Sequence, residues 1–141
     1  MRVVWGYDDE TANWVARRIP RCERGFGNCR AAAVLDNDKI VAGVVLHNWN
    51  PEAGVIEMSI ASTTPRWFTR DVAEEILGYA FNKCKCQMVT ARTAEANKRA
   101  RKLWSAMGSS EYIIPNLRGR GESEVIMTMT DDDWSESRIR R

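Results

Sequence analysis

The sequence has no long apolar run, no large excess of one charge and only one histidine. No stretch approaches the roughly 20 apolar residues that a membrane-spanning helix needs. The start MRVVWGYDDE also has no apolar segment like that of a signal peptide. The formal net charge of +2 is too small to indicate a nucleic-acid partner by itself. We therefore expect a cytoplasmic protein that does not contact a membrane.

Metal-binding motifs are also missing from the sequence. The four cysteines, Cys22, Cys29, Cys84 and Cys86, form no C-x-x-C pair, and His47 is far from them along the chain. In a reducing compartment such cysteines are ordinarily free thiols. The sequence therefore predicts four free thiols and no bound metal.

The composition is that of a globular protein. Hydrophobic residues make up 44% of the chain and charged residues 28%, which does not fit a disordered protein. A length of 141 residues suits one domain with its own core. After an acidic DDDW, the chain ends in polar and basic residues. We expect a single domain over residues 1–134 and a polar, basic tail over residues 135–141.

Short apolar runs separated by turn residues predict a set of strands. Asn37-Asp38 lies between two such runs and is a strong signal for a β-hairpin. The predicted strands are 2–7, 31–36, 39–49, 55–62, 86–92, 110–117 and 124–130.

Three segments have the spacing of helices instead: 8–19, 69–83 and 95–107. Asp8 or Asp9 can cap the first helix, and Gly108 is placed to follow the third as its left-handed cap. The element order is then β-α-β-β-β-α-β-α-β-β. Because strands alternate with helices over the second half, this order implies a parallel pair inside a mixed sheet.

This order resembles the GNAT family of N-acetyltransferases over nearly the whole chain. The local matches are GYAFNKCKCQMVTARTAEANKRARKLWSAMG and IIPNLRGRGESEVIMTMT. They look most like small GNAT-like proteins encoded by phages and the branch that acetylates protein N-termini. The resemblance implies an α/β (mixed α+β) fold. Its central, mostly antiparallel sheet is splayed in a V between the fourth and fifth strands, with helices on both faces.

The resemblance also implies acetyl-CoA as co-substrate. GNAT proteins wrap its pyrophosphate in the turn after the fourth strand, with a Gln/Arg-x-x-Gly-x-Gly/Ala signature. The aligned turn here is RWFTRD: Arg66 matches, whereas Thr69 and Asp71 replace the two small residues. Arg66 and Arg70 can pair with phosphate directly. The same residues also suit an ordinary turn in which Thr69 is the N-cap of the next helix.

Other residues of the implied acetyl-CoA site follow from the family pattern. An Asn at the start of the next helix holds the pantetheine arm, and Asn97 occupies that place. Arg101 can reach the phosphate end or the acceptor. The full set of implied residues is Ser59, Ile60, Ala61, Arg66, Trp67, Phe68, Thr69, Arg70, Asn97 and Arg101. Ser59 to Ala61 are included because backbone N–H groups of the fourth strand stabilise the oxyanion in the family.

Catalysis also needs a base for the amine. Many GNAT proteins protonate the leaving thiolate with a Tyr, but Trp104 stands in that position and cannot supply an acidic proton. Strand alternation puts Ile56 and Met58 in the core and Glu57 on the other face, which makes Glu57 a candidate base. His47 is the second candidate, because histidine titrates near neutral pH.

Two functions follow from these observations. The first is an N-acyltransferase that passes acetyl from acetyl-CoA to an amine by direct attack in a ternary complex. The alternative is a catalytically inactive GNAT-fold module for binding or assembly, a phage-related one included, which the missing glycines and missing Tyr favour. The acceptor is left open among a protein N-terminus, a lysine, a small amine and a modified nucleobase. The oligomeric state is also open, a homodimer included. A phage-encoded protein would act in the host cytoplasm.

Overall fold

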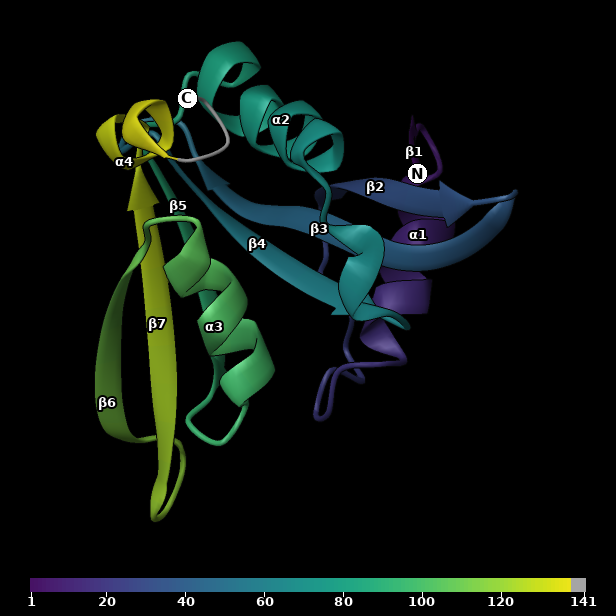
Figure 1. Cartoon of the computed structure of the whole chain (residues 1–141). Coiled ribbons are helices and arrows are strands. Elements are labelled where there is room, and N and C mark those ends of the chain that lie inside the picture. The colour runs from purple at the N-terminus through teal and green to yellow at the C-terminus, as the bar shows by residue number, and fades with distance from the viewer. Residues whose placement is uncertain (138–141) are drawn as a thin grey trace.

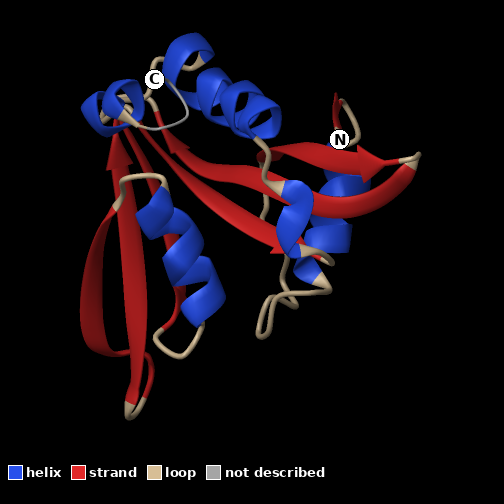
Figure 2. Cartoon of the chain, viewed as in Figure 1, coloured by secondary structure: helices blue, strands red, loops and turns tan. Residues whose placement is uncertain are grey.

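A computed structural model describes residues 1–137 as one mixed sheet flanked by helices (Figures 1 and 2). The strands are β1 Arg2–Trp5, β2 Cys29–Asp36, β3 Lys39–Asn50, β4 Val55–Ser62, β5 Met88–Ala94, β6 Ser110–Gly119 and β7 Glu122–Thr130. The α-helices are α1 Asp8–Ala16, α2 Arg70–Gly78, α3 Lys98–Ala106 and α4 Asp131–Glu136. A short 3-10 turn, η1 (Pro65–Trp67), precedes α2, and a π-helical turn, η2 (Tyr79–Lys83), follows it.

The sheet order is β1-β2-β3-β4-β5-β7-β6, and within residues 1–137 only β4 and β5 pair in parallel. Their pairing is short: it runs from Val55 to Glu57 on β4, opposite Met88 to Thr90 on β5. Beyond this point the two strands diverge (Figure 1). We call the gap between them the splay. The predicted fold class is confirmed, including the parallel pair and the V-shaped divergence.

Apolar residues of alternating strand positions build a separate core on each face of the sheet. On one face, Val44 and Leu46 of β3 and Met58 of β4 join the larger cluster with α2, α3 and α4. On the other face, Val45 of β3 packs with Val15 and neighbouring residues of α1. Helices therefore cover both faces, as predicted. The contacts of α1 fall on β2, β3 and β4, at one side of the splay.

Most predicted local signals are confirmed. Asn37 and Asp38 form the β2–β3 turn with φ of 51° and 65°, the left-handed backbone that a two-residue hairpin requires. Thr69 caps α2 through Val72 N–H, and Gly108 follows α3 with φ of 94°. The predicted cap of α1 is wrong, because Tyr7 holds the N-cap position. Asp8 Oδ1 instead accepts the backbone N–H of Ala31 at 2.8 Å, which ties the start of α1 to β2.

Helix α4 was not predicted from the sequence. Thr130 and Asp133 form a reciprocal capping box at its start, and Trp134 is 3% exposed and stacks on Phe81. The predicted tail, residues 135–141, therefore begins inside α4. Its residues 138–141 lie outside the described part of the chain.

Within residues 1–137, no helix is long and apolar enough to cross a membrane. The four cysteines are free, and Cys86 is buried.

Candidate functional site

The splay leaves one edge of β4 without a strand partner, and the register identifies the residues on it. Just after β4, Thr63 N–H donates to the carbonyl oxygen of Val41 on β3 at 2.8 Å. The odd-numbered residues of β4 therefore point their N–H and C=O groups to β3. The residues between them, Met58, Ile60 and Ser62, point their N–H and C=O groups the other way. Pairing with β5 extends to Glu57 opposite Thr90, and in a parallel ladder this pair takes up the N–H of Met58; beyond it, the N–H and C=O groups of Ile60 and Ser62 face the splay. Of the predicted oxyanion donors Ser59 to Ala61, the geometry therefore singles out Ile60.

A polar cluster lies beside the splay on the face that α1 covers. Asn48 Nδ2 donates to Glu57 Oε1 at 3.1 Å. His47 Nε2 lies 2.8 Å from Ser59 Oγ and 3.7 Å from Glu57 Oε2. The side chains of His47 and Glu57 are 8% and 18% exposed. The structure thus brings both predicted catalytic residues together, next to Ser59.

The environment of His47 keeps its imidazole neutral near pH 7. Burial lowers the pKa of His47 below its ordinary value of 6.5; Glu57 opposes the shift and Arg92 on β5 adds to it. Phe26 packs on the ring with centroids 4.9 Å apart, which shields it from water. The contact of His47 with Glu57 is therefore a polar contact and not an ion pair at neutral pH.

The cluster contains serine, histidine and glutamate, but its geometry differs from that of a hydrolytic triad. In a triad the serine and the carboxylate contact different ring nitrogens. Here Ser59 and Glu57 both lie nearest to Nε2 of His47. The arrangement does not activate Ser59 as a nucleophile, so a covalent acyl-serine route is not supported.

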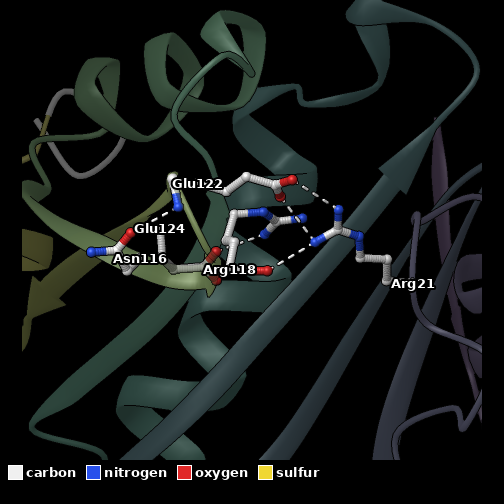
Figure 3. A network of polar contacts seen from close by, with 6 residues as sticks. Arg21, Asn116, Arg118, Glu122 and Glu124 are labelled. Atoms are coloured by element: carbon white, nitrogen blue, oxygen red, sulfur yellow. Dashed lines mark hydrogen bonds and ion pairs between the residues drawn. The ribbon is translucent and has the colours of Figure 1, made fainter.

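The segment between α1 and β2 reaches across to the β6–β7 hairpin (Figure 3). We call residues 17–28 the strap. Arg21 of the strap donates to Arg118 O at 2.8 Å and pairs with Glu122 at 3.0 Å. Because α1 lies over β2, β3 and β4 and the hairpin lies beyond β5 in the sheet order, the strap crosses the splay.

The hairpin end of this bridge is itself braced from within. Arg118 pairs with Glu124, which is 5% exposed, at 2.7 Å, and Asn116 Oδ1 accepts Gly121 N–H at 2.8 Å (Figure 3). Glu124 alternates with the core residue Val125, so it lies on the same face of the sheet as Glu57. Phe26 of the strap covers His47 of the polar cluster, and Arg21 anchors the strap to the hairpin. Sequence analysis missed this bridge, because no local pattern links Arg21 with a residue 101 positions away.

The predicted phosphate-binding turn adopts a well-packed conformation on the opposite face. Thr64 Oγ1 accepts the N–H of Arg66 at 3.3 Å, and Thr69 caps α2. Trp67 is 3% exposed in the larger core, and Phe68 packs against the same cluster. Arg66 and Arg70 are exposed at the start of α2. The arginines and the first N–H groups of α2 therefore carry chemistry that suits an anion, whereas the two aromatic side chains are core.

The predicted residues of α3 already have partners within the chain. Asn97 is the N-cap: its Oδ1 accepts Ala100 N–H at 3.2 Å, and its Nδ2 donates to Thr93 Oγ1 at 2.9 Å. Arg101 pairs with Glu111 through two guanidinium nitrogens and donates to Glu95 O at 2.8 Å. A contact of either residue with acetyl-CoA would have to replace or share these bonds.

Trp104, at the position of the usual acid, is 3% exposed in the larger core. Nearby Ser109 Oγ is buried without a hydrogen-bond partner among the described residues. Among residues 1–137, no three His, Cys, Asp or Glu side chains gather in a way that could hold a metal ion.

Comparisons with known proteins agree with this fold. No protein-family model matches the chain, and no curated protein sequence matches it significantly. Among solved structures, a protein from T. thermophilus assigned as an acetyltransferase is 15% identical, with a TM-score of 0.65 over 81% of this chain. Our chain spans only 64% of the length of that protein.

Two other similar structures carry more specific names. Spermidine N-acetyltransferase SpeG from Vibrio cholerae, as an F149A mutant, is 13% identical, with a TM-score of 0.75 over 96% of this chain and 98% of SpeG. Ribosomal-protein-S5-alanine acetyltransferase from Vibrio fischeri is 16% identical, with a TM-score of 0.63 over 75% of this chain and 63% of that one. The narrower resemblance to phage-encoded proteins or to N-terminal acetyltransferases stays a prediction. At these identities the comparisons establish the fold, and the fold of this chain is that of the GNAT acetyltransferases.

Proposed function

We propose that this chain is an acyl-CoA-dependent N-acyltransferase that passes the acetyl group of acetyl-CoA to an amine in a ternary complex. The observation that carries the proposal is the splay. It presents the unpaired N–H of Ile60 next to a half-buried carboxylate, Glu57, on an open strand edge. The two walls beside the splay belong to different faces of the sheet. One substrate can therefore enter beside α2 and α3, and the other beneath the strap.

Acetyl-CoA fits the first of these walls in part. The free N–H and C=O groups of Ile60 and Ser62 suit the amides of a pantetheine arm laid along the strand edge. The start of α2, with Arg66 and Arg70, suits phosphate. Thr69 and Asp71 fit less well, because they lack the backbone freedom of glycine and add a negative charge. Cations near the mouth of the splay must offset that charge.

The chain's own groups account for the attack of the amine on the acetyl carbonyl. The N–H of Ile60 stabilises the oxyanion that forms when the amine nitrogen bonds to the carbonyl carbon. Glu57 takes the proton that the amine loses, through a water, because its carboxylate is turned toward Asn48 and His47 of β3. A base is needed because an unperturbed lysine amine is roughly one part in a thousand neutral at pH 7.

Departure of the thiolate of CoA requires a proton from elsewhere. Trp104 cannot supply it, and its indole is buried in the core. Water that reaches the splay is the remaining donor on this route. Positioning of the two substrates can contribute several kcal/mol, so transfer without a dedicated acid is chemically adequate.

The acceptor is an amine whose class we leave open: a protein N-terminus, a lysine, a small amine or a modified nucleobase. The names of the similar structures include a spermidine acetyltransferase and an alanine acetyltransferase of a ribosomal protein. Those names describe those proteins. They motivate a first panel of polyamines and peptides with free N-termini.

A second function is favoured by specific contacts. Asn97 and Arg101 are committed to partners inside the chain, and the turn at Thr69 carries no glycine. These features suit a GNAT-fold module that binds or assembles without catalysis. It differs from the enzyme in one measurable way, because it transfers no acetyl group to any amine of the panel.

The proposal is tested by assaying acetyl transfer with the wild-type chain and Glu57→Gln. We expect the substitution to lower kcat/KM by about 10²-fold or more, with acetyl-CoA affinity nearly unchanged, because a base acts on the amine and not on the nucleotide. The acidic limb of the pH–rate profile should be lost as well. Activity that survives Glu57→Gln but is abolished in His47→Ala would assign the base to His47. Absence of transfer to every amine, with acetyl-CoA bound, would favour the binding module.

A further inference from the structure

One contact joins the two sides of the splay at its wide end. Arg99, in the first turn of α3, donates from Nη2 to Oγ of Ser62, the last residue of β4, at 3.4 Å. Figure 1 shows that α3 begins where β4 and β5 are farthest apart. The guanidinium therefore spans the mouth through which a ligand lying in the splay must extend. We propose that Arg99 leaves Ser62 to bind a phosphate of acetyl-CoA, which makes it the mobile cation of the cofactor site.

The contacts of Arg99 differ from those of its neighbour Arg101. Arg101 is matched by the carboxylate of Glu111, which neutralises its charge. Arg99 is exposed, and its hydrogen bond reaches a neutral hydroxyl near the upper limit of hydrogen-bond length. Among the described residues no carboxylate pairs with it. A weak bond to a neutral partner is readily exchanged for a charge-assisted bond to phosphate, which is roughly twice as strong.

The chemistry of the turn explains why a cation at this place matters. Thr69 and Asp71 occupy the positions at which small residues would let the backbone N–H groups approach the phosphates closely. The negative charge of Asp71 also repels the phosphates. Ser62 is the last residue of β4, from which the chain runs through η1 into this turn, so a guanidinium that contacts Ser62 lies at the end of β4 where this segment begins. The guanidinium of Arg99 on α3 therefore compensates for the phosphate contacts that the backbone of the turn does not make.

This inference rests on the proposed use of acetyl-CoA. Arg99 can have one of two roles, a structural bond to Ser62 or a bond to phosphate, and the two roles predict different effects of mutation. If Arg99 only held α3 against β4, removing either partner of the bond would have the same effect. If Arg99 binds phosphate, Ser62 is a competitor, and removing its hydroxyl frees the guanidinium. Arg99→Gln and Ser62→Ala must then affect affinity differently.

The experiment measures acetyl-CoA binding by calorimetry at low salt for the full chain and its variants. We expect Arg99→Gln to weaken binding about tenfold to a hundredfold, Arg99→Lys to recover part of the loss, and Ser62→Ala to bind as tightly as the wild type or tighter. Lys85→Gln is the control for net charge, because Lys85 is exposed just before β5, at the end of the sheet where β4 and β5 are paired and away from Ser62, and should bind normally. Circular dichroism verifies that each variant is folded.

A second arm identifies the phosphate. The wild type and Arg99→Gln are each titrated with CoA and with 3′-dephospho-CoA. If Arg99→Gln weakens the binding of CoA but not that of 3′-dephospho-CoA, Arg99 binds the 3′-phosphate. If it weakens the binding of both ligands, Arg99 binds the pyrophosphate. Equal affinity of wild type and Arg99→Gln for acetyl-CoA overturns the inference alone. Equal weakening by Arg99→Gln and Ser62→Ala also overturns it, in favour of a structural bond. A folded wild type that does not bind acetyl-CoA overturns the proposed function and this inference together.

Discussion

Gly43 of β3 sets how closely α1 can approach the sheet. A Cβ atom added there would lie 2.5 Å from Cγ2 of Val15, which is fully buried, and 3.5 Å from the ring of Trp14. Real Cβ contacts are not that short, so Gly43→Ala forces α1 or Val15 to move. Overpacking of this kind costs about 1–3 kcal/mol of unfolding free energy. We expect Gly43→Ala to be destabilised by that amount.

The cause of the loss can be isolated with a double mutant. Val15→Ala removes the clashing methyl group and by itself costs about 2 kcal/mol, from lost burial and the space left behind. In Gly43→Ala/Val15→Ala the new methyl group occupies part of that space. The double mutant should therefore be more stable than the sum of the single effects predicts, by about 1 kcal/mol or more.

Urea unfolding followed by circular dichroism measures all four proteins, and Gly78 supplies a matched control. Gly78 lies in α2 with a helical backbone, and a Cβ there meets only Asn82 Nδ2, at 3.7 Å. Gly78→Ala should therefore stabilise the chain by about 0.5–1 kcal/mol. Additive effects of Gly43→Ala and Val15→Ala, or a Gly43→Ala protein as stable as the wild type, would refute the packing argument.

Three further predictions follow from single contacts. The pKa of His47 is lowered in the folded state, so below pH 6.5 the unfolded chain binds a proton that the folded chain does not, and the free energy of unfolding should fall as the pH falls. In urea titrations between pH 5 and 7.5, His47→Gln should reduce this dependence of stability on pH. Arg21→Gln removes the bridge to Glu122, so amide exchange of the strap should speed up while exchange of β2 stays unchanged; equal rates would contradict the bridge. Asn97→Ala should cost about 1 kcal/mol as a lost N-cap, whereas Asn97→Asp keeps the cap; equal losses would refute the capping role.

Much of the fold follows from local sequence signals. In three places the residue type itself favours the local conformation that the structure has: the hairpin turn at Asn37-Asp38, the helix cap at Thr69 and the end of α3 at Gly108. The cap of α1 could not be predicted in the same way. Asp8 has the chemistry of an N-cap, but its carboxylate binds Ala31 N–H, and only the tertiary packing of α1 on β2 makes that partner available. For α4, the Thr130–Asp133 box was present in the sequence and was missed.

The site was predictable where strand alternation governs it. Alternation placed Glu57 on the face opposite Met58, and the structure has it there, beside His47. The pairing of His47 with Ser59 and the reach of Arg21 to the β6–β7 hairpin depend on register and on contacts between distant segments. Sequence periodicity carries no information on either. The roles of these residues in catalysis stay predictions.

The most direct test of the central claim is an NMR titration of the labelled chain with acetyl-CoA. The account predicts that the backbone amides of Ile60 and Ser62, on the free edge of β4, shift in saturable fashion, together with amides at the start of α2. Amides of β1 and β2, at the far edge of the sheet, should stay in place. A folded chain whose Ile60 and Ser62 amides do not respond to millimolar acetyl-CoA would contradict the claim that the splay is an acyl-CoA site.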